Sequence, residues 1–151
     1  MIKKVLILDL DNTIYPVSAI GQKLFKPLFD LIERNGEYCG DIDSVKTEIM
    51  RRPYQHVAKD FGFSESLFSK SMELMNNLTY EEPIAPFDDY RFVKDLPITR
   101  YLVTVGFTKL QQSKIKHLGI ESDFASVYII DPNKTDMNKK ICLFRLCMLK
   151  I

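Results

Sequence analysis

Apolar residues change their spacing several times along the chain, and each change indicates an element. Residues 3–8 form a short continuous apolar run that ends in acidic and turn-forming residues, which predicts a buried strand. Apolar residues then recur every three or four positions over 18–34, from about 41 to 61 with an interruption at Pro53, and over 64–78. This spacing predicts three helical stretches.

The second half of the chain returns to strand-like patterns. Residues 100–105 and 126–130 are rich in β-branched and aromatic side chains, and a helical pattern over 110–118 separates them. Helices are also expected at 88–96 and 137–151. Three strands separated by helices predict an α/β fold with a Rossmann-like parallel sheet, built from 1–14 and 97–151. The block 15–96 exceeds one crossover and predicts an inserted helical cap domain.

Composition narrows the class of protein. The 151 residues include 21 Lys and Arg and 20 Asp and Glu, a net charge of +1, which gives no reason to expect a nucleic-acid or anionic-membrane partner. An apolar fraction of 46% is typical of a globular domain, and no apolar run approaches the roughly 18 residues of a membrane span. Three cysteines without a paired motif, and a start without a cleavage site, favour a cytoplasmic protein.

Two acids follow the first predicted strand, in the stretch Asp9-Leu10-Asp11-Asn12-Thr13. Ligand sites of open parallel sheets collect beyond the strand ends. Two carboxylates so close together repel each other unless a cation holds both ionised, and oxygen ligands suit Mg²⁺ together with phosphate oxygens. The alternative is that these residues only end the strand in an Asx turn.

The stretch ILDLDNTIYP resembles the first signature, D-x-D-x-T, of the haloacid dehalogenase superfamily, in the form found in its phosphatases. The second signature, an apolar strand ending in Thr or Ser, resembles Tyr101 to Gly106 with Thr104 as the hydroxyl residue. Asp9 and Thr104 are 95 residues apart, as in members with a helical cap inserted after the first motif. The resemblance covers nearly the whole chain, and further residues fit it after the second motif: Lys109, Leu110, Gln111, Lys114, Leu118 and Gly119.

The resemblance implies a role for each motif residue. Asp9 would attack phosphorus and form an aspartyl-phosphate, and Asp11 would protonate the leaving oxygen and then activate water. The side chain of Asp9 and the backbone carbonyl of Asp11 would bind Mg²⁺. Thr104 would donate a hydrogen bond to a phosphoryl oxygen, assisted by N–H groups at the start of the next helix. Asp11 favours a phosphatase, because a halide leaving group needs no proton.

The third and fourth signatures are less clear. In the family the third signature is a lysine whose ammonium neutralises the charge of the phosphate and the nucleophile. Three lysines could fill this place: Lys134, Lys139 and Lys140. Lys139 is favoured because it begins the last predicted helix. The fourth signature, a pair of acids that completes the Mg²⁺ shell, is missing, since residues 140–151 contain neither Asp nor Glu. This predicts a chain truncated before the fourth motif. The apolar end would otherwise pair with another chain, as in self-association.

The leading hypothesis is therefore a Mg²⁺-dependent hydrolase that cleaves a small phosphomonoester, with a nucleotide monophosphate suggested by analogy. The cap would select the substrate. The alternative is a catalytically impaired remnant that binds phosphate or a protein partner. A phospho-acceptor receiver domain fits poorly, because its acceptor aspartate lies on a middle strand and the fold tolerates no long insertion after the first strand.

Overall fold

The computed structural model describes residues 4–135, which belong to two compact units. One unit contains the chain up to Pro16 together with the chain from Thr79 onward, and the other contains Val17–Leu78. Residues 79–96 thus fall in the unit that holds the strands, whereas the sequence pattern placed them in the helical insertion. Two backbone hydrogen bonds tie this stretch to its own unit, from Ile84 N to His117 O at 3.1 Å and from Phe87 N to Ile14 O at 2.8 Å.

The first unit is built on a three-stranded parallel sheet in the order β1-β2-β3. β1 spans Val5–Leu8, β2 spans Thr99–Val105 and β3 spans Ser126–Ile130. Leu8 is level with Leu102, and Thr104 with Ile129. Since all three strands run the same way, the residues that follow β1 and the last residues of β2 lie at one edge of the sheet. The predicted α/β class and its parallel sheet are confirmed.

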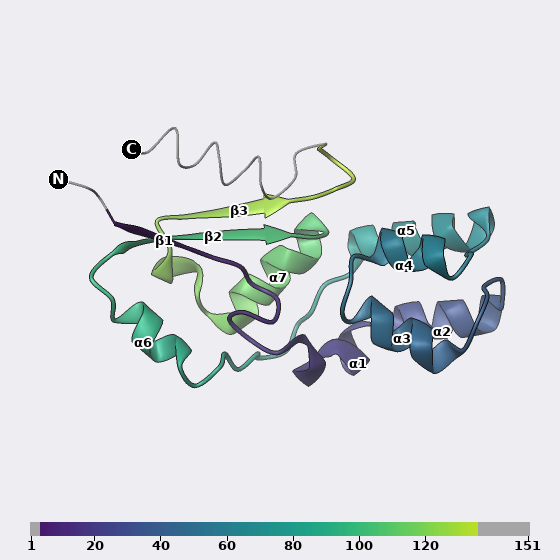
Figure 1. Cartoon of the computed structure of the whole chain (residues 1–151), viewed down its shortest axis with the longest axis horizontal. Helices are drawn as coiled ribbons and strands as arrows, with labels where there is room; N and C mark the ends of the chain where they lie inside the picture. The colour runs from purple at the N-terminus through teal and green to yellow at the C-terminus, as the bar shows by residue number, and fades with distance from the viewer. Residues whose placement is uncertain (1–3, 136–151) are drawn as a thin grey trace. The chain divides into compact units, whose positions relative to one another are not determined.

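Helix α7, Thr108–Leu118, follows β2 and lies beside the sheet (Figure 1). Side chains alternate along β2, so Thr104 faces α7 while Val103 packs on the opposite face with Ile7, Tyr128 and Ile130. α7 ends at Gly119, whose φ of 66° allows the chain to leave the helix in a left-handed turn.

The other elements of the first unit lie toward the start of β2. They are α6, Tyr90–Lys94, and the 3₁₀ helix η2, Glu121–Asp123. The Arg100 side chain donates to three carbonyl oxygens there, those of Asp123 at 3.1 Å, Val93 at 3.2 Å and Leu96 at 2.7 Å. The guanidinium of Arg100 thus holds the segment around α6 and the segment around η2 at the start of β2.

The second unit is entirely helical, as the apolar spacing predicts. It consists of η1 (Val17–Ala19), α1 (Gly21–Leu24), α2 (Lys26–Asn35), α3 (Ile42–Ile49), α4 (Tyr54–Asp60) and α5 (Glu65–Asn77). The single helix expected over 18–34 is divided, because Pro27 stands at the start of α2 and cannot donate a backbone hydrogen bond. Side-chain caps start two of the others, Asp41 accepting from Ser44 N and Ser64 from Leu67 N. Fully buried residues form its core: Leu28, Ile32, Val45, Val57 and Leu67.

Some expectations fall on residues outside the described range. The helix expected over 137–151, its proposed self-association and the two lysines Lys139 and Lys140 belong to this group. Among the helices of residues 4–135, none combines the length and the apolar character needed to cross a bilayer.

Candidate active site

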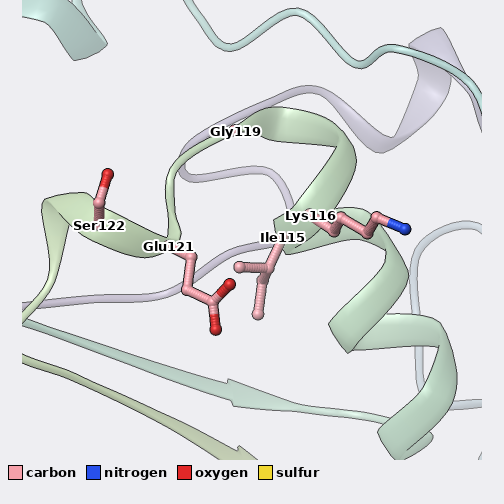
Figure 2. Close-up of a pocket in the computed structure, with 5 residues that line it drawn as sticks. All are labelled: Ile115, Lys116, Gly119, Glu121 and Ser122. Carbon is pink, nitrogen blue, oxygen red and sulfur yellow. The ribbon is translucent and has the colours of Figure 1, made fainter.

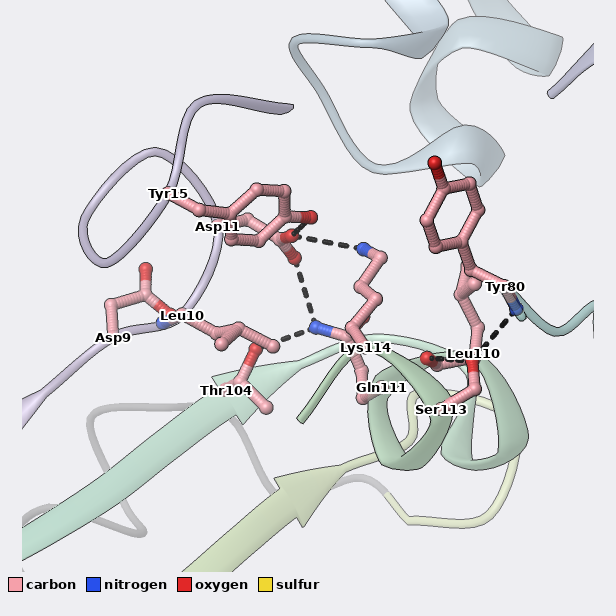
Figure 3. Close-up of polar contacts among 10 residues, drawn as sticks. All are labelled: Asp9, Leu10, Asp11, Tyr15, Tyr80, Thr104, Leu110, Gln111, Ser113 and Lys114. Atoms are coloured by element: carbon pink, nitrogen blue, oxygen red, sulfur yellow. Dashed lines mark hydrogen bonds and ion pairs between the residues drawn. The ribbon is translucent and has the colours of Figure 1, made fainter. Parts of the chain in front are cut away.

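The loop after β1 carries both motif aspartates. Asn12 has a φ of 56°, which is uncommon outside glycine, and the N–H groups of Thr13 and Ile14 donate to Leu10 O at 3.3 and 3.0 Å. This tight turn ends the strand at once. The Asp9 carboxylate is half-buried and accepts the N–H of Leu10 at 2.8 Å, while the Asp11 carboxylate turns toward α7 (Figure 3).

The Asp11 carboxylate is bound by three donors. The Tyr15 hydroxyl donates to Oδ1 at 2.6 Å, and the Lys114 ammonium approaches the same oxygen at 2.9 Å. The Gln111 amide donates to Oδ2 at 2.9 Å. Both oxygens are thus held by side chains of α7 and of the turn itself. Figure 3 shows Lys114 and Gln111 reaching Asp11 from α7 and Tyr15 reaching it from the loop after β1, with Asp9 on the β1 side of the turn.

Thr104 belongs to the same network. Its hydroxyl accepts from the Gln111 amide at 2.6 Å, and the residue as a whole is 1% exposed. Gln111 therefore joins the end of strand β2 to the loop after β1, two segments about 100 residues apart in the chain. Because a hydroxyl both donates and accepts, Thr104 keeps its own proton for another acceptor. Asp11 and Thr104, two of the predicted site residues, are thus joined through Gln111.

The electrostatics of the network favour a charged Asp11. Burial by itself would raise the pKa of Asp11, but the Lys114 ammonium and the donors Tyr15 and Gln111 outweigh burial, so the pKa of Asp11 is lowered. Burial and the charge of Asp11 raise the pKa of Tyr15, so its hydroxyl remains a donor. At neutral pH the site therefore holds an aspartate–lysine ion pair.

Three of these residues had no assigned role in the sequence analysis: Tyr15, Gln111 and Lys114. The resemblance already pointed to Gln111 and Lys114 without giving them a role. A further signal is that Lys114 is a charged residue in the same apolar stripe of α7 as Leu110 and Leu118. A buried lysine in such a position is rare unless it is paired with an opposite charge. Which partner it has depends on the packing of α7 against the loop after β1.

The start of α7 is occupied by a carboxylate of the protein itself. Asp131, which follows β3 and is 4% exposed, accepts from Thr108 N at 3.0 Å and from the Thr108 hydroxyl at 2.7 Å. The N–H of Thr108, one of the helix-start donors expected to help bind phosphate, is therefore already used. Lys134, one candidate for the third-signature lysine, donates to the Thr108 hydroxyl at 2.9 Å and is 64% exposed.

The loop after β1 offers few oxygen atoms that could bind Mg²⁺, so the ion would have few protein ligands there. Within residues 4–135, no three His, Cys, Asp or Glu side chains come together as a metal site. The Asp11 carboxylate already faces an ammonium, which leaves the Asp9 carboxylate and the Asp11 backbone carbonyl. Mg²⁺ commonly binds one or two protein oxygens and completes its shell with water and substrate phosphate, so these oxygens fit the ion.

A separate depression of about 420 Å³ lies near the end of α7, lined by Ile115, Lys116, Gly119, Glu121 and Ser122 (Figure 2). It contains none of the motif residues. Ligands of parallel sheets bind at the carboxyl ends of the strands, which is where the loop after β1 and Thr108, at the other end of α7, both lie. For that reason the loop after β1, and not this depression, is the candidate active site.

Comparisons with known proteins agree with this fold. No protein-family model matches the sequence, and a search of curated proteins found no match. The chain resembles a suggested β-phosphoglucomutase from Thermotoga maritima (TM-score 0.52, 16% identity, covering 98% of this chain and 71% of that one). It also resembles a haloacid dehalogenase-superfamily hydrolase from Ehrlichia chaffeensis (TM-score 0.50, 17% identity, 100% and 75%).

A third similar structure is L-2-haloacid dehalogenase from Xanthobacter autotrophicus, with a TM-score of 0.49 and 15% identity over 99% of this chain. The present chain spans 66% of the length of that dehalogenase. At 16% and 17% identity, the similarity to the Thermotoga maritima and Ehrlichia chaffeensis structures establishes the fold but not the activity. The chain has the α/β fold of the haloacid dehalogenase-superfamily hydrolases.

Proposed function

We propose that the chain is a phosphatase of the haloacid dehalogenase superfamily that hydrolyses a small phosphomonoester, such as a nucleotide monophosphate. The observation that supports it is the network at the strand ends. Gln111 joins Thr104 to Asp11, which lies two residues after Asp9 in the chain. A nucleophile, a second acid and a buried hydroxyl at one sheet edge are the groups that phosphoryl transfer through a covalent intermediate requires.

The reaction has two halves. A carboxylate oxygen of Asp9 forms a bond to phosphorus as the bond to the leaving oxygen breaks, and Asp11 gives that oxygen a proton. Water then attacks the aspartyl-phosphate, Asp11 takes a proton from it, and phosphate leaves Asp9. The negative charge of an arriving phosphate opposes the effect of Lys114 and favours the protonated form of Asp11 needed in the first half.

The remaining groups serve charge and orientation. Thr104 would donate its proton to a phosphoryl oxygen, and Lys139 would place a positive charge near the phosphate. Mg²⁺, held by Asp9 and the backbone of Asp11, would reduce the repulsion between carboxylate and phosphate. A halide leaves without a proton, so the presence of Asp11 supports a phosphomonoester over a haloacid as substrate. We also infer a cytoplasmic location, since the three cysteines form no paired motif.

The test is hydrolysis of p-nitrophenyl phosphate with Mg²⁺ by the full chain and by Asp9→Asn. The variant keeps the shape of the side chain but removes the nucleophilic carboxylate, so turnover should fall to background. Asp88→Asn is the matched control, because Asp88 is an exposed aspartate of the same unit. Equal rates for wild type and Asp9→Asn would exclude Asp9 as the nucleophile.

The alternative is a binding module without turnover. It is favoured by the ion pair that already occupies the Asp11 carboxylate and by the two-ligand metal site. Titration calorimetry with inorganic phosphate separates the two functions. Binding of phosphate without hydrolysis of any monoester supports the module, whereas hydrolysis that depends on Asp9 excludes it.

A further inference from the structure

Lys114 is a buried cation whose position packing alone does not explain. Its side chain is 4% exposed, and it shares a stripe of α7 with Leu110 and Leu118, which are both buried. Removing an ammonium from water costs several kcal/mol unless a partner offsets the loss. An apolar residue of similar length would fill this position without that cost.

The partner of Lys114 is much more open than Lys114 itself. The Asp11 side chain is 29% exposed, and its Oδ1 lies 2.9 Å from the ammonium. The ammonium is thus enclosed in the protein while the carboxylate retains access to the surface. A pair that served only to stabilise the fold gains nothing from exposing one member, whereas a carboxylate that reacts with a substrate has to be reachable.

Two neutral donors complete the hold on Asp11. Tyr15, which is fully buried, donates to the oxygen that Lys114 contacts, and Gln111, 1% exposed, donates to the other. An aspartate on a surface turn ordinarily rotates among several side-chain conformations. Asp11 accepts from two side chains of the packed helix α7 and from the buried Tyr15. These three donors fix both carboxylate oxygens and leave Asp11 one orientation.

We propose that Lys114 is a positioning residue for Asp11, whose ammonium, together with Tyr15 and Gln111, holds the carboxylate in the orientation that serves the leaving-group oxygen and the attacking water. The inference rests on the proposed phosphatase function, since it concerns the same two halves of the reaction. Lys114 touches neither phosphorus nor the leaving group in this proposal, and it acts only through Asp11.

The test compares two leaving groups. p-Nitrophenolate leaves with little help from a proton, whereas the alkoxide of glycerol 2-phosphate needs one. Lys114→Met keeps the length of the apolar stem and removes the ammonium. We expect kcat for glycerol 2-phosphate to fall by about tenfold more than kcat for p-nitrophenyl phosphate, because general acid catalysis typically supplies roughly 10²–10⁴-fold. Lys116→Met, on the exposed side of α7, should leave both rates unchanged.

A second variant covers failure of Lys114→Met to fold. Tyr15→Phe keeps the buried ring and removes one donor to Asp11, and it should show the same preference for p-nitrophenyl phosphate to a smaller degree. A double variant adds a further check. If Lys114 acts through Asp11, Lys114→Met should not slow Asp11→Asn any further on glycerol 2-phosphate.

Equal losses on both substrates, or losses that multiply in the double variant, would overturn the inference and leave Lys114 a structural residue. Those outcomes differ from failure of the proposed function, in which the wild type hydrolyses neither ester or Asp9→Asn remains active. Failure of that kind removes the inference as well, since there is then no leaving group for Asp11 to serve.

Discussion

The amide of Gln111 packs against the bare Cα of Gly106. A Cβ built on Gly106 would lie 3.0 Å from Cδ of Gln111 and 3.1 Å from its Cγ. These distances are tighter than ordinary van der Waals contact, so the absence of a side chain at Gly106 is what lets Gln111 reach both Thr104 and Asp11. The glycine after β2 is thus part of the candidate site.

Gly106→Ala should displace Gln111 and loosen the network. We expect a loss of about 1–3 kcal/mol in the free energy of unfolding, as for other overpacked positions. Turnover of a phosphomonoester should fall roughly tenfold or more, because small misplacements at an active site are costly. Urea unfolding and steady-state kinetics measure the two effects.

Gly119→Ala is the control for Gly106→Ala. Gly119 has a φ of 66° and open space around its Cα, so alanine there adds backbone strain without touching Gln111. It should lower stability by roughly 1 kcal/mol and leave kcat unchanged. Loss of activity of the same size in both variants would show that Gly106 acts only through stability.

Removal of divalent cations should abolish hydrolysis, and Mg²⁺ should restore it. Asp9 and the backbone of Asp11 provide few ligands, so binding should be weak and should tighten when substrate phosphate is present. The measurement is the rate with p-nitrophenyl phosphate after EDTA treatment, at increasing Mg²⁺. Ca²⁺ serves as the control ion. Hydrolysis that survives EDTA would contradict the proposed cofactor.

Asp131 should make the fold sensitive to acid. Burial alone would raise its pKa, but hydrogen bonds from Thr108 and Asn133 and the charge of Lys134 lower the pKa below its ordinary value of 3.8. The folded chain then binds fewer protons at this group than the unfolded chain. Its contribution is complete above about pH 4 and is lost as the pH falls through the lowered pKa.

Asp131→Asn should therefore be less stable than the wild type at pH 7, by about 1–3 kcal/mol, and should lose less stability on acidification. Urea midpoints measured between pH 7 and pH 3 test both statements, with Asp88→Asn as an exposed control. Parallel pH profiles for wild type and Asp131→Asn would contradict the assignment.

Arg100 should matter for stability and not for catalysis. Arg100→Met leaves three carbonyl oxygens without their charged donor at the start of β2, the edge opposite Thr104. We expect a loss of about 1.5–3 kcal/mol in the free energy of unfolding with kcat unchanged. Arg91→Met, at an exposed position, should change stability by less than about 0.5 kcal/mol. A lower kcat in folded Arg100→Met would contradict this division.

The order of strands and helices could be predicted from apolar spacing, and two details could not. Pro27 divides the first long helix, although the apolar pattern continues through it. Residues 79–96 belong with the strands because Ile84 and Phe87 bond to distant backbone groups. Spacing reports which face of a segment is buried, but it does not report the partner that buries it.

The candidate site shows the same division. The meeting of the loop after β1 with the end of β2 could be predicted, because parallel strands bring their carboxyl ends to one edge. The catalytic and binding roles of Asp9, Asp11 and Thr104 stay predictions. Lys139, the expected third-signature lysine, stays a prediction outside the described residues. The roles of Tyr15, Gln111 and Lys114 were not predicted, since each depends on a contact with Asp11.

The sequence by itself determined the α/β architecture and the edge of the sheet at which the motif aspartates and Thr104 lie, since local periodicity and strand direction suffice for these. The tertiary structure alone decided that a buried lysine, a tyrosine and a glutamine hold Asp11. Such contacts join residues up to 103 positions apart, and they form only when α7 packs beside the strand ends, which no local pattern of residues specifies.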